Sequence, residues 1–212
     1  MKKMVLFVSI LMNLTLVAFI LLIAIHYKEE LTQKLIDKRH SADIVMFGDS
    51  HTAGVKWNSL IDGYSVKTIG RGGFNTDQLK GLITNSIDYK PKFVFILCGS
   101  NDIGSRCFNI DNTIANFKCM ADALRGNNIT PVFQKLFYQV NNPGFNAVID
   151  TINMRLLSFC KNENIDFLDI TDGMMDSTGL RKTMTRDGLA HLNEDGYKVW
   201  SKWINYYLKN KK

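Results

Sequence analysis

The residues best suited to chemistry are a serine and a histidine that lie far apart in the chain. Ser50 stands in "GDSHTAG", and His191 stands in "TRDGLAHLNEDG", with Asp187 four residues before it. A serine hydroxyl becomes a nucleophile when a histidine accepts its proton and an acid orients that histidine. These residue types therefore predict acyl transfer, provided that the fold brings the two segments together.

The four histidines of the chain are unequal candidates for the general base. His26 ends an apolar run, His40 lies in a charged segment, and the side chain of His51 should point away from that of its neighbour Ser50. His191 remains, and it lies in a loop before the last predicted helix. On its own, however, an Asp and a His four residues apart also fit an ordinary solvated loop, and Ser50 could simply cap a helix.

Two further segments could stabilise an oxyanion. "TIGRGGFNT" places Gly70, Gly72 and Gly73 after a predicted strand, and a glycine N–H can approach a reacting oxygen closely. "CGSND" places Asn101 after the most apolar strand, where its side-chain amide could donate a second hydrogen bond. The alternative for each segment is a plain turn.

The hydrophobic pattern predicts the elements that would position these residues. Apolar or alternating runs predict strands at 43–47, 64–69, 92–98, 130–137 and 165–170. Helical patterns fall at about 75–88, 111–126, 145–163 and 193–209. Strands that alternate with helices indicate a parallel sheet covered on both faces, and such sheets bind ligands beyond the carboxyl ends of their strands. All four candidate segments follow a strand or precede the last helix.

Taken in order, the four segments resemble the SGNH hydrolase family, also called the GDSL-type lipases and esterases. The matching blocks are "FGDSHT", "GRGGFNT", "GSND" and "DGLAHLN", and the resemblance covers about residues 42–208. It implies a flavodoxin-like three-layer α/β/α sandwich with a five-stranded parallel sheet and a shallow, solvent-accessible site.

The resemblance also implies a role for each matching residue. Ser50 corresponds to the nucleophile and contributes its N–H to the oxyanion hole. Gly73 corresponds to the second N–H donor, with Gly72 as the alternative alignment. Asn101 corresponds to the side-chain donor and His191 to the base. No metal or cofactor is required for this chemistry.

The acid is the least secure of these assignments. The family usually spaces its acid and base as Asp-x-x-His, whereas Asp187 stands one residue further from His191. A helical turn would still place both side chains on one face. Otherwise a backbone carbonyl, Glu194 or Asp195 could orient the ring. The remaining block residues Asp49 and Asp102 are expected to be structural.

The N-terminal residues predict a membrane anchor. Lys2 and Lys3 precede an apolar run from Met4 to Ile25, which as a helix would span roughly 33 Å, enough for a bilayer core of about 30 Å. We expect a transmembrane signal anchor at 1–26, a charged stalk at 27–41 and the hydrolase domain at 42–212. A cleaved signal peptide is the alternative. The two lysines place the N-terminus in the cytoplasm and the domain outside it, periplasmic or on the cell surface.

The composition of the chain limits the kinds of ligand that we expect it to bind. The formal net charge of +6 gathers towards the ends of the chain rather than in a basic patch with interleaved aromatics, so we expect no nucleic-acid binding. Four cysteines show no zinc-ligand spacing, and Cys107 and Cys119 could either form a disulfide or remain free thiols. Oligomeric state leaves no signal in the sequence.

These observations predict a serine esterase that removes small acyl groups, such as acetyl, from cell-envelope carbohydrate. The short loops after the strands offer no long apolar cap to shelter an acyl chain. The alternatives are an O-acetyltransferase that uses the same residues, a lysophospholipase or thioesterase, and a non-catalytic membrane-tethered binding module.

Overall fold

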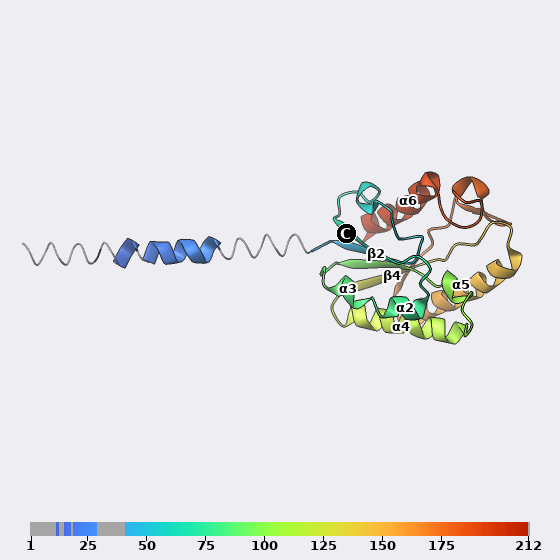
Figure 1. The fold of residues 1–212 in the computed structure, drawn as a ribbon, viewed down its shortest axis with the longest axis horizontal. Helices are drawn as coiled ribbons and strands as arrows, with labels where there is room; N and C mark the ends of the chain where they lie inside the picture. The colour runs from blue at the N-terminus through green and yellow to red at the C-terminus, as the bar shows by residue number, and fades with distance from the viewer. Residues whose placement is uncertain (1–11, 13–14, 18, 29–40, 212) are drawn as a thin grey trace, which may run out of the picture. The chain divides into compact units, whose positions relative to one another are not determined.

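The structure of the chain is a computed structural model that describes residues 12, 15–17, 19–28 and 41–211. The chain divides into two units, Met1–Ser41 and Ala42–Lys212. In the second unit a parallel sheet lies between two layers of helices (Figure 1). This is the three-layer architecture that the sequence predicts.

Five parallel strands form the sheet, in the order β2-β1-β3-β4-β5. Their bounds are Ile44–Gly48 (β1), Val66–Gly70 (β2), Phe93–Leu97 (β3), Thr130–Gln134 (β4) and Asp166–Leu168 (β5). This is the strand order of flavodoxin-like folds, in which ligands bind where the order reverses, between β1 and β3. The registers pair Gly48 with both Gly70 and Leu97, so the loops that carry three of the four blocks leave the sheet at one edge.

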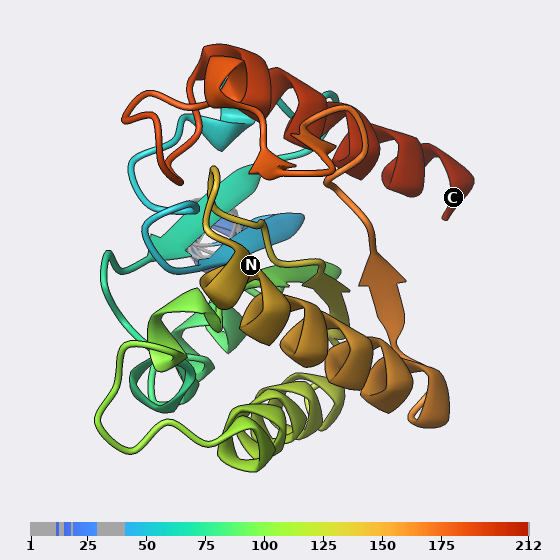
Figure 2. The same ribbon diagram turned by 90° about the vertical axis from the view of Figure 1, so that its right-hand side faces the viewer.

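The helices cover the sheet unequally. One face packs against α2 (Thr76–Lys80), α3 (Thr84–Ile87), α4 (Ile110–Arg125) and α5 (Pro143–Asn162). The other packs against α6 (Glu194–Asn210) and the short 3-10 helix η1 (Trp57–Ser59). Figures 1 and 2 show α6, in red, on the opposite side of the strands from α4 and α5.

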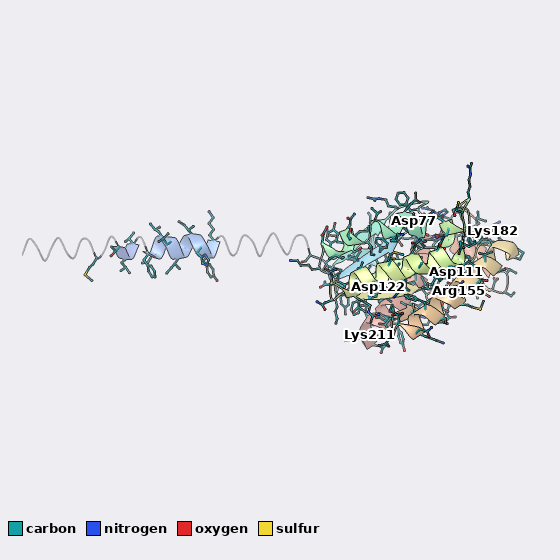
Figure 3. All side chains as sticks on the ribbon, turned by 90° about the horizontal axis from the view of Figure 1, so that it is seen from below. Asp77, Asp111, Asp122, Arg155, Lys182 and Lys211 are labelled. Atoms are coloured by element: carbon teal, nitrogen blue, oxygen red, sulfur yellow. The ribbon has the colours of Figure 1, made fainter. Side chains whose placement is uncertain are left out.

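Alternation along the central strands builds a separate core on each face. Val45 and Phe47 of β1 join the cluster under α4 and α5, whereas Ile44 and Met46 join the cluster under α6. All four side chains are fully buried, as expected for a strand covered on both sides. At the surface, an ion pair between Arg155 on α5 and Asp111 on α4 joins two helices of one layer (Figure 3).

The structure corrects some boundaries. The predicted helix at 75–88 is two short helices, because residues 81–83 form a turn between α2 and α3. The last strand shortens to three residues. The sequence analysis predicted neither the small antiparallel pair β6 (Met175–Asp176) and β7 (Gly179–Leu180) nor the 3-10 helices η1, η2 (Ser100–Asp102) and η3 (Lys182–Met184).

Most of the predicted transmembrane segment and stalk lies outside the described residues. Positions 12, 15–17 and 19–28 are helical, and their large apolar side chains are exposed. Among the residues that the structure describes, no helix is long and apolar enough to cross a membrane. The anchor therefore stays a prediction.

The four cysteines are free thiols. Cys98 and Cys160 are buried, and Cys107 and Cys119 are exposed without being joined to each other. Cys98 is buried at the end of β3, as its position after an apolar strand predicts.

Close packing at Gly48 generates a test of the fold. A Cβ atom at this position would collide with the backbone carbonyl of Leu97 and with Oγ1 of Thr52. We expect Gly48→Ala to lower the free energy of unfolding by about 1–3 kcal/mol, because backbone cannot move aside cheaply. Urea denaturation followed by circular dichroism measures the change.

Gly144→Ala is the matched control, since a Cβ there meets nothing within 4 Å and the residue lies in α5. It should leave stability unchanged or raise it by up to about 1 kcal/mol. Equal destabilisation by both substitutions would contradict the packing argument.

Candidate active site

Ser50 lies in a tight turn at the carboxyl end of β1. The Asp49 N–H donates to the Leu97 carbonyl at 3.3 Å, and the Asp49 carbonyl accepts from Thr52 and Ala53 at 3.2 and 3.0 Å. The Trp57 indole then donates to the Thr52 carbonyl at 3.1 Å. These bonds hold the turn that carries Ser50, which we call the nucleophile loop (residues 49–53), against the neighbouring strand β3.

The structure brings Ser50, His191 and Asp187 together. Ser50 Oγ lies 3.1 Å from His191 Nε2, and His191 Nδ1 lies 2.6 Å from Asp187 Oδ2. Both distances are within hydrogen-bonding range. The two ring nitrogens therefore face a hydroxyl on one side and a carboxylate on the other, which is the arrangement that activates a serine through a histidine.

The extra residue between Asp187 and His191 is absorbed by a compact turn. Asp187 Oδ1 accepts the backbone N–H groups of Leu189, Ala190 and His191 at 2.9, 3.0 and 3.2 Å. Gly188 makes this turn with a φ of +71°, which a residue with a side chain rarely adopts. One carboxylate oxygen thus caps the turn, and the other remains free for the imidazole.

These contacts keep Asp187 ionised. Partial burial opposes ionisation, but the hydrogen bonds from the His191 ring and from three backbone N–H groups outweigh it and hold the pKa of Asp187 well below its usual range. The carboxylate consequently stays negative at any pH at which the base works, and it can stabilise the imidazolium that forms during proton transfer.

The segment from 186 to 192, which we call the base loop, is held at several points. The Arg186 N–H donates to the His191 carbonyl at 2.9 Å, and the Val140 N–H donates to the Leu189 carbonyl at 2.8 Å. Leu192 is buried in the core under α6. The backbone of His191 is therefore fixed on both sides of the residue, which limits the positions of its ring.

Three backbone N–H groups are available as oxyanion donors. Among the described residues, those of Ser50, Gly72 and Gly73 donate to no protein acceptor. A Cβ placed on Gly72 would lie 3.8 Å from the Ser50 Cβ, so the glycine turn passes beside the nucleophile. Gly73 has a φ of +77°. The geometry keeps both glycines as donors and does not choose between the two alignments.

Asn101 lies on η2, one turn beyond β3. Its Nδ2 donates to the Phe74 carbonyl at 3.0 Å. An amide nitrogen carries two hydrogens, so this bond orients the group and leaves a second donor. Because Phe74 follows Gly73 in the chain, Asn101 also links the two segments that would form the oxyanion hole.

Asp102 is structural, as expected from the sequence. It is buried and accepts from the Thr76 N–H at 2.9 Å, from the Thr76 hydroxyl and from the Thr113 hydroxyl at 2.9 Å. These bonds join η2 to α2 and α4. Asp49 is also buried, and it pairs with His51, as described below.

Sequence reasoning missed His51. It excluded this residue as the base, and the ring does not contact the Ser50 hydroxyl. The structure instead stacks the His51 ring beside that of His191, with centroids 5.6 Å apart and planes 24° apart. The Asp-x-His spacing of Asp49 and His51 was the one available signal, and only the fold shows what it faces.

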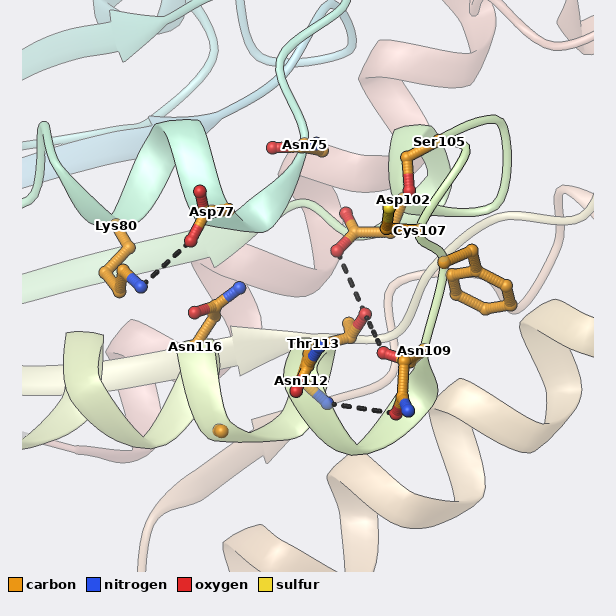
Figure 4. A pocket seen from close by; sticks show the side chains of 12 residues that line it. Asn75, Asp77, Lys80, Asp102, Ser105, Cys107, Asn109, Asn112, Thr113 and Asn116 are labelled. Carbon is orange, nitrogen blue, oxygen red and sulfur yellow. Dashed lines mark hydrogen bonds and ion pairs between the residues drawn. The ribbon is translucent and has the colours of Figure 1, made fainter.

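A polar pocket of about 400 Å³ lies next to the oxyanion segments. Figure 4 shows it between α2 and α4, lined by Asn75, Asn109, Asn112 and Asn116 together with Asp102. Asn75 follows Phe74 in the chain and Asp102 follows Asn101. Neither Ser50 nor His191 lines this pocket.

The family model described as the GDSL-like lipase/acylhydrolase family matches residues 46–199. The chain belongs to this family. It is therefore an ester-hydrolysing enzyme, and the sequence resemblance to SGNH hydrolases is confirmed. No curated protein matches the chain.

Solved structures share the fold. A GDSL-like lipase from Bacteroides thetaiotaomicron is similar with a TM-score of 0.73 and 20% identity, over 88% of this chain and 98% of that one. An acylhydrolase structure from Bacteroides fragilis is similar with a TM-score of 0.71 and 22% identity, over 79% and 86%. An acetylxylan esterase from Geobacillus stearothermophilus is similar with a TM-score of 0.63 and 14% identity, over 76% and 91%.

The hydrogen bonds of Asp187 generate a second test. Asparagine at this position can still accept the turn's N–H groups but carries no charge to stabilise the imidazolium. We expect Asp187→Asn to lower kcat on p-nitrophenyl acetate by a factor on the order of 10²–10⁴ while the protein stays folded. Steady-state kinetics and circular dichroism measure the two effects.

Asp195→Asn is the control, because it removes a carboxylate of the same region whose one ion pair among the described residues is with Lys198 at the surface. Its kcat should match that of the wild type. If Asp187→Asn kept wild-type turnover, another group would have to orient the base.

Proposed function

We propose that this enzyme is a serine esterase that uses Ser50, His191 and Asp187 to remove small acyl groups from cell-envelope carbohydrate. The observation that carries the catalytic part is the continuous chain of hydrogen bonds from the Ser50 hydroxyl through the His191 ring to Asp187. A binding module without catalysis would have no need for this alignment.

In the first half of the reaction, His191 Nε2 takes the proton of Ser50 as the oxygen attacks the ester carbonyl. The carbonyl oxygen becomes an oxyanion, which accepts hydrogen bonds from the Ser50 N–H, from the Gly73 or Gly72 N–H and from the Asn101 amide. The imidazolium is stabilised by Asp187. His191 then gives its proton to the leaving alcohol, and the acyl group remains on Ser50.

In the second half, His191 removes a proton from a water molecule that attacks the acyl-enzyme. Collapse of the second oxyanion releases the carboxylic acid and returns the proton to Ser50. About a third of the His191 side chain is exposed, so water has direct access to the base. A sugar hydroxyl in place of this water would make the same site an O-acetyltransferase.

Two observations support a small acyl group on carbohydrate. The lining of the pocket beside the oxyanion segments includes four side-chain amides and the hydroxyls of Ser105 and Thr113, which are groups that hydrogen-bond sugar hydroxyls (Figure 4). The structural relatives include the Geobacillus acetylxylan esterase. With the expected N-terminal anchor, such a domain would act outside the cytoplasm on acetylated polysaccharide or peptidoglycan.

Removal of the nucleophile tests the catalytic proposal. We expect Ser50→Ala in the full-length protein to lose ester hydrolysis by a factor on the order of 10⁴ or more, because no other hydroxyl of the described residues is within hydrogen-bonding distance of the His191 ring. Turnover of p-nitrophenyl acetate and labelling by a fluorophosphonate probe measure the loss. Ser158→Ala, an exposed position on α5, is the control. Wild-type turnover by Ser50→Ala would refute the mechanism.

A panel of esters tests the substrate class. We expect kcat/KM to fall as the acyl chain of p-nitrophenyl esters lengthens from acetyl to octanoyl, and acetylated sugars to be deacetylated. Rising kcat/KM with chain length would instead favour a lysophospholipase. Acetate release and transfer to an added sugar are measured together with a labelled acyl donor, and predominant transfer would favour the O-acetyltransferase.

A further inference from the structure

His51 is a buried histidine whose two ring nitrogens both face acceptors. Nδ1 lies 3.1 Å from Asp49 Oδ1, and Nε2 lies 3.2 Å from the carbonyl oxygen of Ala190. The residue is only 8% exposed. A neutral imidazole has a single N–H and would leave one acceptor facing a lone pair, whereas an imidazolium donates to both.

Asp49 supplies the countercharge. It is 1% exposed, and a carboxylate at that depth is costly unless it is paired. The backbone N–H of His51 donates to the same Oδ1 at 3.0 Å, as suits an ionised acceptor. Burial lowers the pKa of His51, but the hydrogen bond and charge of Asp49, with help from the Ala190 carbonyl and Asp187, raise it above its ordinary value.

The other titratable groups around this pair lie on three further segments. They are Asp187 and His191 in the base loop, Tyr197 on α6, and Cys98 beside Asp49 after β3. The Tyr197 hydroxyl donates to the His51 carbonyl at 2.9 Å, and burial raises the pKa of this phenol to about 12, so it is neutral. Burial also raises the pKa of the Cys98 thiol. Of these groups, Asp187 therefore carries a further negative charge close to His51, and the Arg186 cation lies close enough to Tyr197 to oppose the rise of its pKa.

We propose that His51 is a positively charged positioning residue that ties the base loop to the nucleophile loop. The inference rests on the proposed roles of Ser50 and His191. His51 follows Ser50 directly. Its ring donates a hydrogen bond to the carbonyl of Ala190, which directly precedes His191. A single side chain thus bridges the two loops whose separation sets the distance between Ser50 and His191.

Two substitutions separate the charge from the tether. His51→Gln removes the charge but can still donate to the Ala190 carbonyl, whereas His51→Phe keeps an aromatic ring and loses both hydrogen bonds. We expect kcat for p-nitrophenyl acetate to fall on the order of 10–100-fold further in His51→Phe than in His51→Gln.

Tyr197→Phe is the matched control, because it removes the hydroxyl that bonds the His51 carbonyl without changing any charge. Its kcat should match that of the wild type. Equal kcat in the two His51 variants would overturn the proposal. Circular dichroism checks that each variant is folded.

Nuclear magnetic resonance decides the same question without turnover. In the ¹⁵N-labelled full-length protein, we expect the His51 ring to keep both N–H protons between about pH 6 and 8. A neutral His51 over this range would overturn the proposal, whether or not the protein hydrolyses esters. Absence of ester hydrolysis by the wild type would instead refute the proposed function alone.

Discussion

The hydrogen bond between Ser50 and His191 joins residues 141 positions apart, and much of the fold serves to keep its two ends together. Neither loop could hold its position alone. The nucleophile loop follows the end of β1, and the backbone N–H of Asp49 joins it to β3 by a hydrogen bond. The base loop is held by Leu192, which is buried under α6, and by hydrogen bonds to its own backbone and to Val140. The distance between Ser50 and His191 thus depends on two separate cores, one on each face of the sheet.

The sequence was sufficient for the architecture because that information is local. Each signal that was used depends on a few neighbouring residues. The signals are the continuous apolar runs in β1 and β3, the amphipathic patterns in α4 to α6, and the serine, the glycine turn and the asparagine that follow three strands. Parallel topology then brings the strand ends to one edge without further detail. The predicted boundaries of helices and strands were wrong where a local turn interrupts a regular pattern. Residues 81–83, for example, form a turn that divides one predicted helix in two.

Two features of the site lay beyond sequence reasoning for a physical reason. Whether Asp187 reaches His191 depends on the left-handed φ of Gly188 and on which carboxylate oxygen caps the turn, and spacing alone contains neither. The environment of His51 depends on Ala190 and Tyr197, residues about 140 positions away. Adjacent side chains normally diverge, and this argument correctly separates His51 from the Ser50 hydroxyl. It cannot show that the ring of His51 stacks beside the ring of His191.

The order of the proposed catalytic residues along the chain has a consequence for biosynthesis. The nucleophile loop and the strands around it precede His191, the proposed base, and Leu192 of the base loop shares a core cluster with Trp200, Ile204 and Leu208 of α6. A chain that has emerged only as far as α5 therefore contains Ser50 but not His191. The proposed catalytic set is complete only after the growing polypeptide has passed the base loop, and the α6 residues that bury Leu192 follow it.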